Sequence, residues 1–262
     1  SLTGITTEKT PPPFNARTRV HEYGGGAFLA ADGVVYFSNF SDQRLYRQSG
    51  DAAPLPLTSV ESLRYADAVL DRAHNRLICV REDHRVADHE AINTIVSIPL
   101  NEAEAGQTIL ASGNDFYASP RLSPDGSYLS WISWNHPNMP WDGTDLWIAR
   151  VQSDGSLSEP QHIAGGKQES IFQPEWSPDG VLYFVRDRTG WWNFDRWHPQ
   201  GEVESVLTLE AEFGLPQWVF GMSTYGFAAS DRILCTYTQN GISYLATLDL
   251  TSRELMTLDC PY

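Results

Sequence analysis

Short hydrophobic segments with strand-like alternation recur along the chain, and turns rich in Gly, Pro, Asp and Asn separate them. No stretch keeps the hydrophobic period of a helix, so we expect helix to be nearly absent. The pattern therefore predicts an all-β protein. The predicted central strands are residues 34–38, 76–80, 128–132, 181–185 and 232–237.

A four-residue turn sequence, Ser-Pro-Asp-Gly, occurs at residues 123–126 and again at residues 177–180. Proline presets φ for a turn, the aspartate side chain caps it, and glycine takes the position with positive φ. Each copy lies between an extended segment and a hydrophobic strand, and the copies are 177 − 123 = 54 residues apart. A repeat of about 50 residues built from short strands is typical of a β-propeller blade.

We therefore expect a β-propeller of four-stranded blades, of which five are visible. Residues 1–20 are polar, contain three consecutive prolines and are expected to form an extended lead-in, and residues 21–262 to form the propeller. The first and last blades would expose strand edges, which favours self-association. The blades are expected near residues 24–60, 61–112, 113–166, 167–216 and 217–262.

The composition is sufficient for a large core and narrows the range of partners. Of the 262 residues, 41% are apolar and 12% aromatic. The formal net charge of −15 argues against a nucleic-acid partner, because the phosphates would be repelled. No apolar run reaches membrane length and the N-terminus lacks a signal-peptide pattern, so no membrane partner is expected.

The three cysteines predict a reducing location. Cys79, Cys235 and Cys260 show no metal-site spacing and cannot all pair with one another. Cys79 and Cys235 lie within apolar strand patterns, where a buried free thiol is expected. We therefore expect the chain in the cytoplasm, and no cofactor is expected.

The sequence lacks the machinery of a serine hydrolase. No Gly-x-Ser-x-Gly segment is present, and the seven histidines are scattered over the repeats. We therefore expect no catalytic Ser/His/Asp site within this chain.

The densest cluster of titratable residues is segment 81–90, Arg-Glu-Asp-His-Arg-Val-Ala-Asp-His-Glu. Its two histidines, His84 and His89, could bind a metal together with neighbouring carboxylates. The spacing matches no standard metal site, and a charged connection between two strands of a blade explains the segment equally well. The candidate functional residues here are Glu82, Asp83 and His84.

Residues 134–142, Trp-Asn-His-Pro-Asn-Met-Pro-Trp-Asp, form a long connection between two predicted strands. One interpretation is a rigid loop that packs against a partner domain or lines a substrate cavity; the other is a self-packed loop that covers the blade end. The proline and tryptophan residues of the loop are compatible with both interpretations. The candidate functional residues are Trp134, Asn135, His136, Asn138, Met139, Trp141 and Asp142.

Two further segments favour structural roles. Residues 24–26 are three consecutive glycines without the lysine and helix of a phosphate-binding loop, so a close backbone approach near the propeller axis explains them better. Residues 186–193 form a turn with paired tryptophans, which we expect to pack between blades.

Several of these segments together resemble the N-terminal propeller of prolyl oligopeptidase-family serine peptidases, in the branch of acylaminoacyl-peptidase and dipeptidyl aminopeptidase-like enzymes. The match covers most of residues 20–262, and its most specific parts are residues 134–142 and 190–193. The remaining matching segments are residues 21–26, 42–46, 81–84 and 115–126.

The resemblance implies that catalysis belongs to a C-terminal α/β-hydrolase domain of the same polypeptide, so no catalytic residue is carried over to this chain. It also implies that the propeller gates and selects peptide substrates, with the segments around 82–89 and 134–142 facing the hydrolase. Propellers of that family usually have seven or more blades, so five indicate a fragment of a larger propeller. A free-standing interaction scaffold and a lactonase-like, metal-dependent propeller enzyme are the alternatives.

Overall fold

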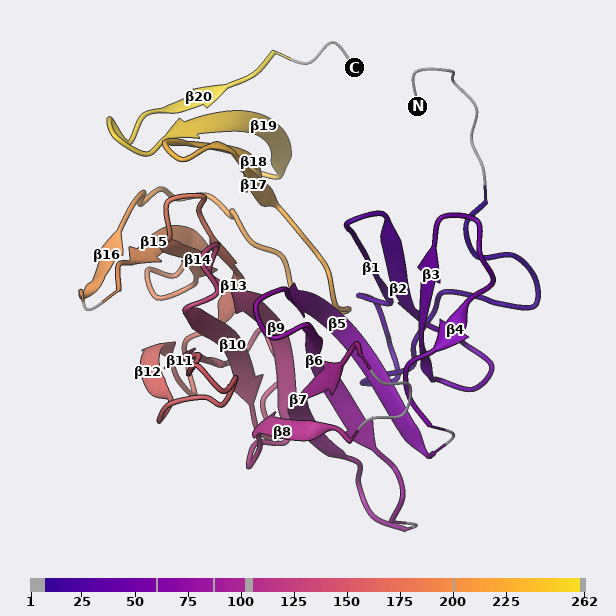
Figure 1. Ribbon diagram of the computed structural model, residues 1–262. Coiled ribbons are helices and arrows are strands. Elements are labelled where there is room, and N and C mark those ends of the chain that lie inside the picture. Colours follow the sequence, from indigo (N-terminus) through magenta and orange to yellow (C-terminus); the bar gives the residue numbers. More distant parts are fainter. Residues whose placement is uncertain (1–7, 60, 87, 102–105, 200, 260–262) are drawn as a thin grey trace. The chain divides into compact units, whose positions relative to one another are not determined.

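The computed structural model describes residues 8–259, apart from residues 60, 87, 102–105 and 200. Within these residues the chain forms strands and turns and no helix, as the sequence predicts, and therefore no helix that could cross a membrane. The strands make five antiparallel sheets of four, each built from consecutive strands (Figure 1). This is the four-stranded blade that the repeats predict.

The strands of each blade follow one another along the chain. Blades 1 and 2 consist of β1 (Phe28–Ala31), β2 (Val34–Ser38), β3 (Leu45–Ser49) and β4 (Leu55–Pro56), and of β5 (Leu63–Asp71), β6 (Arg76–Asp83), β7 (Ile92–Pro99) and β8 (Thr108–Ala111). Blades 3 and 4 consist of β9 (Phe116–Leu122), β10 (Tyr128–Trp134), β11 (Asp145–Arg150) and β12 (Gln161–Gly165), and of β13 (Ile171–Trp176), β14 (Leu182–Arg186), β15 (Asn193–Trp197) and β16 (Val203–Ser205). Blade 5 consists of β17 (Tyr225–Ala229), β18 (Arg232–Gln239), β19 (Ile242–Asp249) and β20 (Leu255–Thr257).

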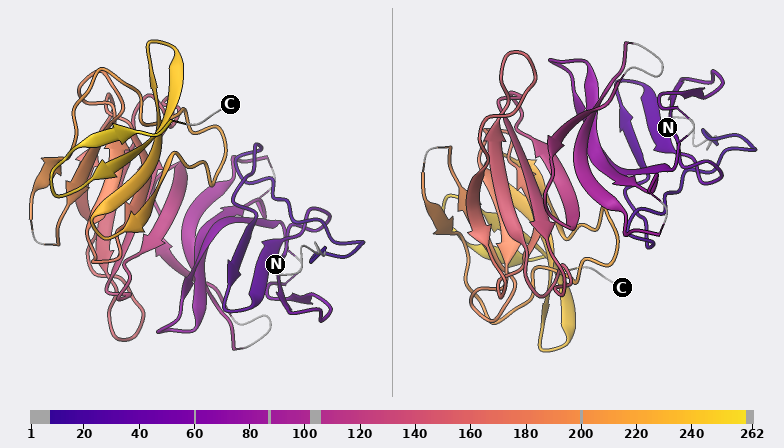
Figure 2. Two further views of the ribbon diagram at one scale, coloured as in Figure 1. Left: turned by 90° about the horizontal axis from the view of Figure 1, so that it is seen from above. Right: turned by 90° about the horizontal axis from the view of Figure 1, so that it is seen from below.

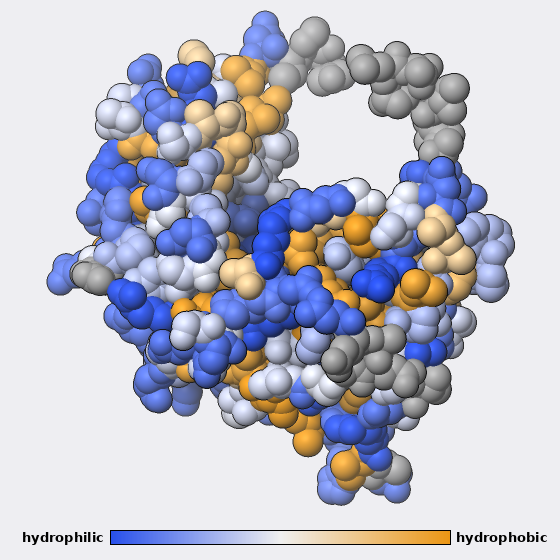
Figure 3. All heavy atoms as spheres, viewed as in Figure 1, coloured by the Kyte–Doolittle hydropathy of each residue, from blue (hydrophilic) through white to orange (hydrophobic). Residues whose placement is uncertain are grey.

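The chain divides into two compact units, residues 1–113 with blades 1 and 2, and residues 114–262 with blades 3 to 5. Within each unit, alternating hydrophobic residues of neighbouring blades form a shared core, and Figure 2 shows the sheets of the second unit as neighbouring layers. On the face drawn in Figure 3, polar residues predominate and hydrophobic ones form small patches. Core residues of the first unit include Tyr36, Leu45, Tyr65, Leu77 and Cys79, and those of the second include Phe172, Phe194, Tyr225, Ile233 and Leu248.

Both Ser-Pro-Asp-Gly segments form the expected turns between the first and second strands of a blade. Ser123 Oγ donates a hydrogen bond to Asp125 Oδ1 at 2.6 Å, and Ser177 Oγ makes the same bond to Asp179. The hydrogen bond from Ser123 helps to hold the pKa of Asp125 below its usual range. Gly126 takes the left-handed conformation, with φ of 72°. These turns are structural, as their composition predicts.

Because consecutive strands are antiparallel, strands two and three of a blade connect at the end opposite the connection between strands one and two. The β6–β7 connection (84–91) and the β10–β11 connection (135–144) are both of this second kind. The two candidate segments therefore occupy equivalent positions, each in its own unit.

The first strands of blades 2, 3 and 4 share a bulge that the hydrophobic pattern did not predict. Asp67, Ser119 and Gln173 have φ of 56°, 53° and 48°, and the pairing register shifts at each of them. The bulge at Gln173 joins two blades, since its Oε1 accepts a hydrogen bond from Thr224 N and its Nε2 donates to Tyr225 O, both at 2.7 Å. The repeat is thus stabilised by polar contacts as well as by its core.

Residues 8–20 contact blade 1. The ring of Phe14 packs edge-on against Phe37 and Tyr46, with centroid distances of 6.0 and 5.1 Å. Ala16 forms a β-bridge with Asn39. The lead-in therefore covers part of one face of the blade.

Cys79 and Cys235 are buried and free, as predicted, whereas Cys260 lies outside the described residues. Burial raises the pKa of both thiols, that of Cys235 to about 12. Neither thiol is therefore reactive in the folded chain.

Candidate functional site

Glu82, at the end of β6, is the centre of a buried ion-pair cluster in the first unit. Its side chain is 6% exposed, and its Oε2 accepts a hydrogen bond from Arg64 Nη1 at 3.3 Å and lies 3.0 Å from His84 Nε2. Its Oε1 accepts a hydrogen bond from the backbone N of His21 at 2.7 Å. Arg64 also pairs with Glu22 at 2.6 Å. The structure thus brings the candidates Glu82 and His84 together, with partners that are distant in sequence.

This cluster holds a strained turn that comes just before blade 1 in the sequence. His21 and Glu22 have φ of 53° and 62°, a conformation that costs free energy unless the surroundings fix it. A Cβ atom on Gly24 would lie 2.4 Å from the carbonyl oxygen of Thr18, so the close backbone approach predicted for the glycine segment is present here. The turn exposes Tyr23, whose accessible fraction is 64%.

The buried ring of His21 makes stability depend on pH. Burial lowers its pKa to about 4, although a hydrogen bond with Asn93 acts in the opposite direction. The ring is therefore neutral in the folded chain at pH values where the unfolded chain begins to bind a proton. Because the unfolded state then binds more protons, this residue's contribution is complete above about pH 6.5 and falls as the pH is lowered to 4, by about 3 kcal/mol in all.

Urea unfolding between pH 7 and pH 4 measures this effect. The variant His21→Asn, whose side chain tolerates positive φ, is expected to lose stability less steeply on acidification than the parent chain. Identical slopes for the two proteins would contradict a neutral buried His21.

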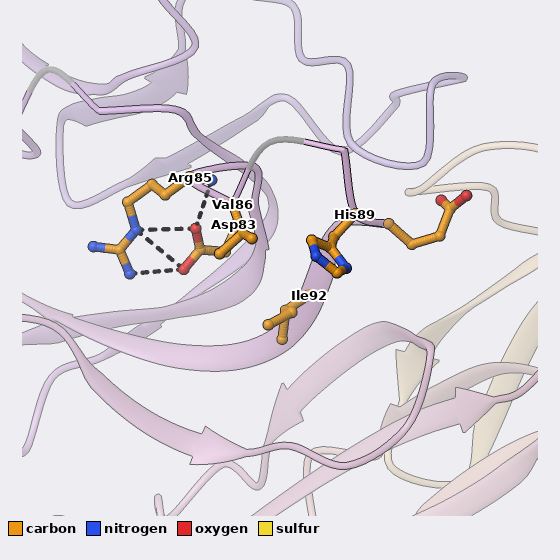
Figure 4. Close-up of a pocket in the computed structure, with 6 residues that line it drawn as sticks. Asp83, Arg85, Val86, His89 and Ile92 are labelled. Carbon is orange, nitrogen blue, oxygen red and sulfur yellow. Dashed lines mark hydrogen bonds and ion pairs between the residues drawn. The ribbon is translucent and has the colours of Figure 1, made fainter.

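Asp83 lies apart from the Glu82 cluster and lines a cavity of about 660 Å³ (Figure 4). Arg85 Nη2 donates to Asp83 Oδ2 at 2.7 Å, and this pairing holds the pKa of Asp83 below its usual range. His89 and the exposed Ile92 lie on the other side of the cavity (Figure 4). A second cavity, of about 270 Å³, adjoins the cluster and is lined by Arg19, Ser41, Asp42, Gln43, Glu61, Ser62, Leu63, Arg64 and His84.

The metal hypothesis for segment 81–90 gains no support. His84 is bonded to Glu82, whereas His89 lines the cavity beside Asp83. The residues that the structure describes contain no group of three or more His, Cys, Asp and Glu side chains placed to hold a metal ion. Residues 81–83 are the end of β6, and residues 84–86 and 88–90 belong to the connection to β7.

The first part of loop 134–142 packs on the start of β9. Trp134 is buried and stacks on Phe116 with ring centroids 5.3 Å apart. Asn135 Oδ1 accepts a hydrogen bond from Asp115 N at 2.8 Å, and Asp115 Oδ2 accepts one from His136 N at 2.9 Å. The His136 ring remains 67% exposed, with Nδ1 3.1 Å from the same carboxylate oxygen. Trp134 and Asn135 therefore attach the loop to the start of β9.

The second part of the loop is also held by its own side chains. Asn138 Nδ2 donates to Lys167 O at 2.9 Å, and Asp142 Oδ2 accepts a hydrogen bond from Met139 N at 2.9 Å. A Cβ atom on Gly143 would lie 2.4 Å from the backbone oxygen of Gly166, so the β10–β11 and β12–β13 connections are in close contact. Asn138 and Asp142 therefore help to hold the loop in place.

Met139 and Trp141 belong to the same loop and are partly exposed. Met139 is 40% exposed, and Trp141 contacts Trp218 with ring centroids 4.4 Å apart and an interplanar angle of 46°. Trp218, Leu215 and Val219, in the connection between β16 and β17, are 52%, 43% and 36% exposed. We call these five residues the aromatic surface. It lies at the same end of the blades as the loop.

Sequence reasoning missed Trp218, Arg64 and Glu22. Trp218 lies in a connection without strand periodicity, and its partner Trp141 is distant in the chain, so local patterns could not pair them. The only sequence signal available was that Leu215 and Trp218 are large apolar residues in an otherwise irregular connection. Arg64 and Glu22 sit in ordinary charged contexts, and only the fold brings them to Glu82.

The paired tryptophans of segment 186–193 have different environments. Trp192 packs against the core of blades 4 and 5 and meets Phe172 edge-on at 6.0 Å, as predicted for packing between blades. A Cβ atom on Gly214 would lie 2.5 Å from the Trp192 ring, so this contact needs glycine. Trp191 is instead 36% exposed.

Five consecutive four-stranded antiparallel sheets define a protein of the β-propeller class. Neither a scan of protein-family models nor a search of curated proteins finds a match. Solved structures do match. A puromycin-hydrolyzing peptidase of Mycobacterium tuberculosis is 38% identical over 99% of this chain and 42% of that chain, with a TM-score of 0.91.

A mutant of puromycin hydrolase complexed with PGG is 35% identical over 99% of this chain and 42% of its own, with a TM-score of 0.91. A putative TolB from Agrobacterium tumefaciens, at 16% identity, 86% and 76% coverage and a TM-score of 0.57, shares the fold alone. The chain belongs to the prolyl oligopeptidase family of peptidases and corresponds to their propeller part. It spans less than half the length of these relatives.

Proposed function

We propose that this chain is a non-catalytic propeller part that gates and selects substrates for a hydrolase part of the same polypeptide. The observation that carries the proposal is the 38% identity over 99% of the chain with a peptidase of which the chain spans 42%. This level of sequence identity supports the view that the chain corresponds to the propeller of a longer enzyme. The remaining length of the relatives is where a catalytic part would lie.

The proposed mechanism is exclusion and orientation rather than bond breaking. Rigid connections at one end of the blades restrict which substrates reach a catalytic site, and exposed side chains on them contact the substrate or the hydrolase part. In the first unit these side chains are Tyr23, His84 and those around Asp83. In the second they are His136 and the aromatic surface. The cluster at Glu82 and the hydrogen bonds of loop 134–142 keep them in fixed positions.

Activity measurements test the division of labour. The isolated chain is expected to hydrolyse neither short peptides nor puromycin, because no catalytic nucleophile is expected in it. A polypeptide that extends this chain to the length of its relatives is expected to hydrolyse both. Hydrolysis by the purified isolated chain would contradict the proposal. Self-association through exposed blade edges remains a prediction that light scattering on dilution can check.

A further inference from the structure

A small cavity lies between blades 3 and 4, at the end of blade 3 that is opposite loop 134–142. Its volume is about 160 Å³. Tyr128 begins β10 and Arg150 ends β11, and the two residues are paired in the register, whereas the loop joins the other ends of these strands. Trp197, the last residue of β15, lines the cavity from blade 4. The cavity is therefore separate from both candidate segments.

The buried part of the cavity lining is apolar and held by ring contacts. Ile148 and Trp197 are 2% and 3% exposed. The Tyr128 ring meets Trp197 edge-on and stacks on Trp176, with centroid distances of 6.0 Å in both cases. Apolar walls around a cavity of about 150 Å³ leave room for a benzene ring, so this cavity can take one large apolar side chain.

Two opposite charges border the same cavity. Arg150 and Glu159 both line it, and both are exposed. The Arg150 guanidinium lies over the Tyr128 ring, 5.0 Å from its centroid, and this contact keeps the charge beside the apolar walls. Among the residues that the structure describes, neither Arg150 nor Glu159 forms an ion pair with the other or with a third group. Both charges are therefore available to a ligand.

The charge of the whole chain favours a ligand without net charge. A net charge of −15 repels an anion, and Arg150 at the cavity repels a cation. A zwitterion avoids both costs, because it offers a carboxylate to an arginine and an ammonium to a glutamate. An α-amino acid combines these two charges with a side chain that can fill the apolar part of the cavity.

We propose that this cavity binds a free α-amino acid with a large apolar side chain. The side chain would pack against Ile148 and Trp197. The carboxylate would accept hydrogen bonds from the Arg150 guanidinium, and the ammonium would donate to the Glu159 carboxylate. The proposal goes beyond the proposed function, because it concerns the other end of the blade and makes no use of a hydrolase part.

Heteronuclear NMR of the tryptophan indole N–H groups in this chain tests the proposal, with L-leucine at millimolar concentration as the probe. Leucine is expected to shift the Trp197 resonance, which is identified by its loss in Trp197→Phe. Glycine, which lacks the side chain, is expected to bind about tenfold more weakly or worse. Leucinamide lacks the carboxylate and N-acetylleucine lacks the ammonium, and each is expected to bind about two- to fivefold more weakly than leucine.

Variants of the two charged residues test their roles. Arg150→Gln and Glu159→Gln are each expected to weaken leucine binding about two- to fivefold, and Arg150→Lys is expected to retain part of the lost affinity. Arg232→Gln and Glu254→Gln are the matched controls, because both residues are exposed in blade 5 and do not line the cavity. Their affinity for leucine should equal that of the parent chain.

Thermal unfolding of each variant separates a loss of binding from a loss of fold. The proposal is overturned if leucine does not shift the Trp197 resonance of the folded parent chain, or if glycine binds as tightly as leucine. It is equally overturned if folded Arg150→Gln and Glu159→Gln both bind leucine like the parent. The comparison of leucine with leucinamide and N-acetylleucine decides the role of the charges even if one variant does not fold. The proposed gating function is measured separately, by hydrolysis in the longer polypeptide, and does not depend on these outcomes.

Discussion

Replacing Glu82 by alanine is expected to lower the free energy of unfolding by about 3–5 kcal/mol, the usual cost of removing one partner of a buried ion pair. The carboxylate accepts hydrogen bonds from the backbone N of His21 and from Arg64, and it lies next to His84. Its removal takes away the acceptor of the His21 N–H and one of the acceptors of Arg64, which keeps Arg19 O and Glu22. The strained turn at His21 and Glu22 would lose the group that holds it.

Urea denaturation of Glu82→Ala, Glu82→Gln and Glu90→Ala measures this contribution. Glutamine keeps an oxygen for the His21 N–H and is expected to restore part of the stability. Glu90, exposed in the same connection, is the control and should change stability by less than about 0.5 kcal/mol. A loss below about 1 kcal/mol for Glu82→Ala would mean that the cluster does not hold the turn.

Replacing Gly165 by alanine is expected to cost about 2–6 kcal/mol, combining backbone strain with overpacking. Gly165, the last residue of β12, has φ of 97°, and a Cβ atom there would lie 1.9 Å from the carbonyl oxygen of Thr144. That oxygen accepts a hydrogen bond from Gly166 N at 2.9 Å, so it cannot move away without breaking the contact that ends loop 134–142. The aromatic surface would then lose its rigid support.

Gly180→Ala provides the matched control for this substitution. Gly180 has a similar φ, 83°, but nothing lies within 4 Å of the place where its Cβ would be. The control should show the cost of positive φ alone, about 1 kcal/mol or somewhat more. Equal losses of stability for the two variants would show that the close contact with Thr144 makes no contribution.

The repeated unit of the fold could be predicted from the sequence because its causes are local. Alternation of apolar residues marks a strand with one buried face, and Ser-Pro-Asp-Gly dictates its own turn geometry, which the Ser123–Asp125 hydrogen bond confirms. The bulges at Asp67, Ser119 and Gln173 were not predictable in this way. Their positive φ is stabilised by contacts such as Gln173 with Thr224, between residues of different blades.

The candidate site was predicted in position more than in detail. Composition marked loop 134–142 as unusual, but it could not separate Asn138 and Asp142, which hold the loop, from Met139 and Trp141, which are partly exposed. That distinction depends on which backbone groups are left unpaired after folding. The two interpretations of the loop were not exclusive, since its hydrogen bonds hold it in place while Met139 remains partly exposed.

The central prediction is that the propeller part gates the access of substrates. The most direct measurement is the ratio of kcat/KM for a short peptide to that for a long unstructured peptide with the same N-terminal residues, in the polypeptide that continues this chain to the length of its relatives. If the rigid connections restrict entry, the short peptide is expected to be preferred by a factor of about ten or more. Equal kcat/KM values for the two peptides would contradict the gating role.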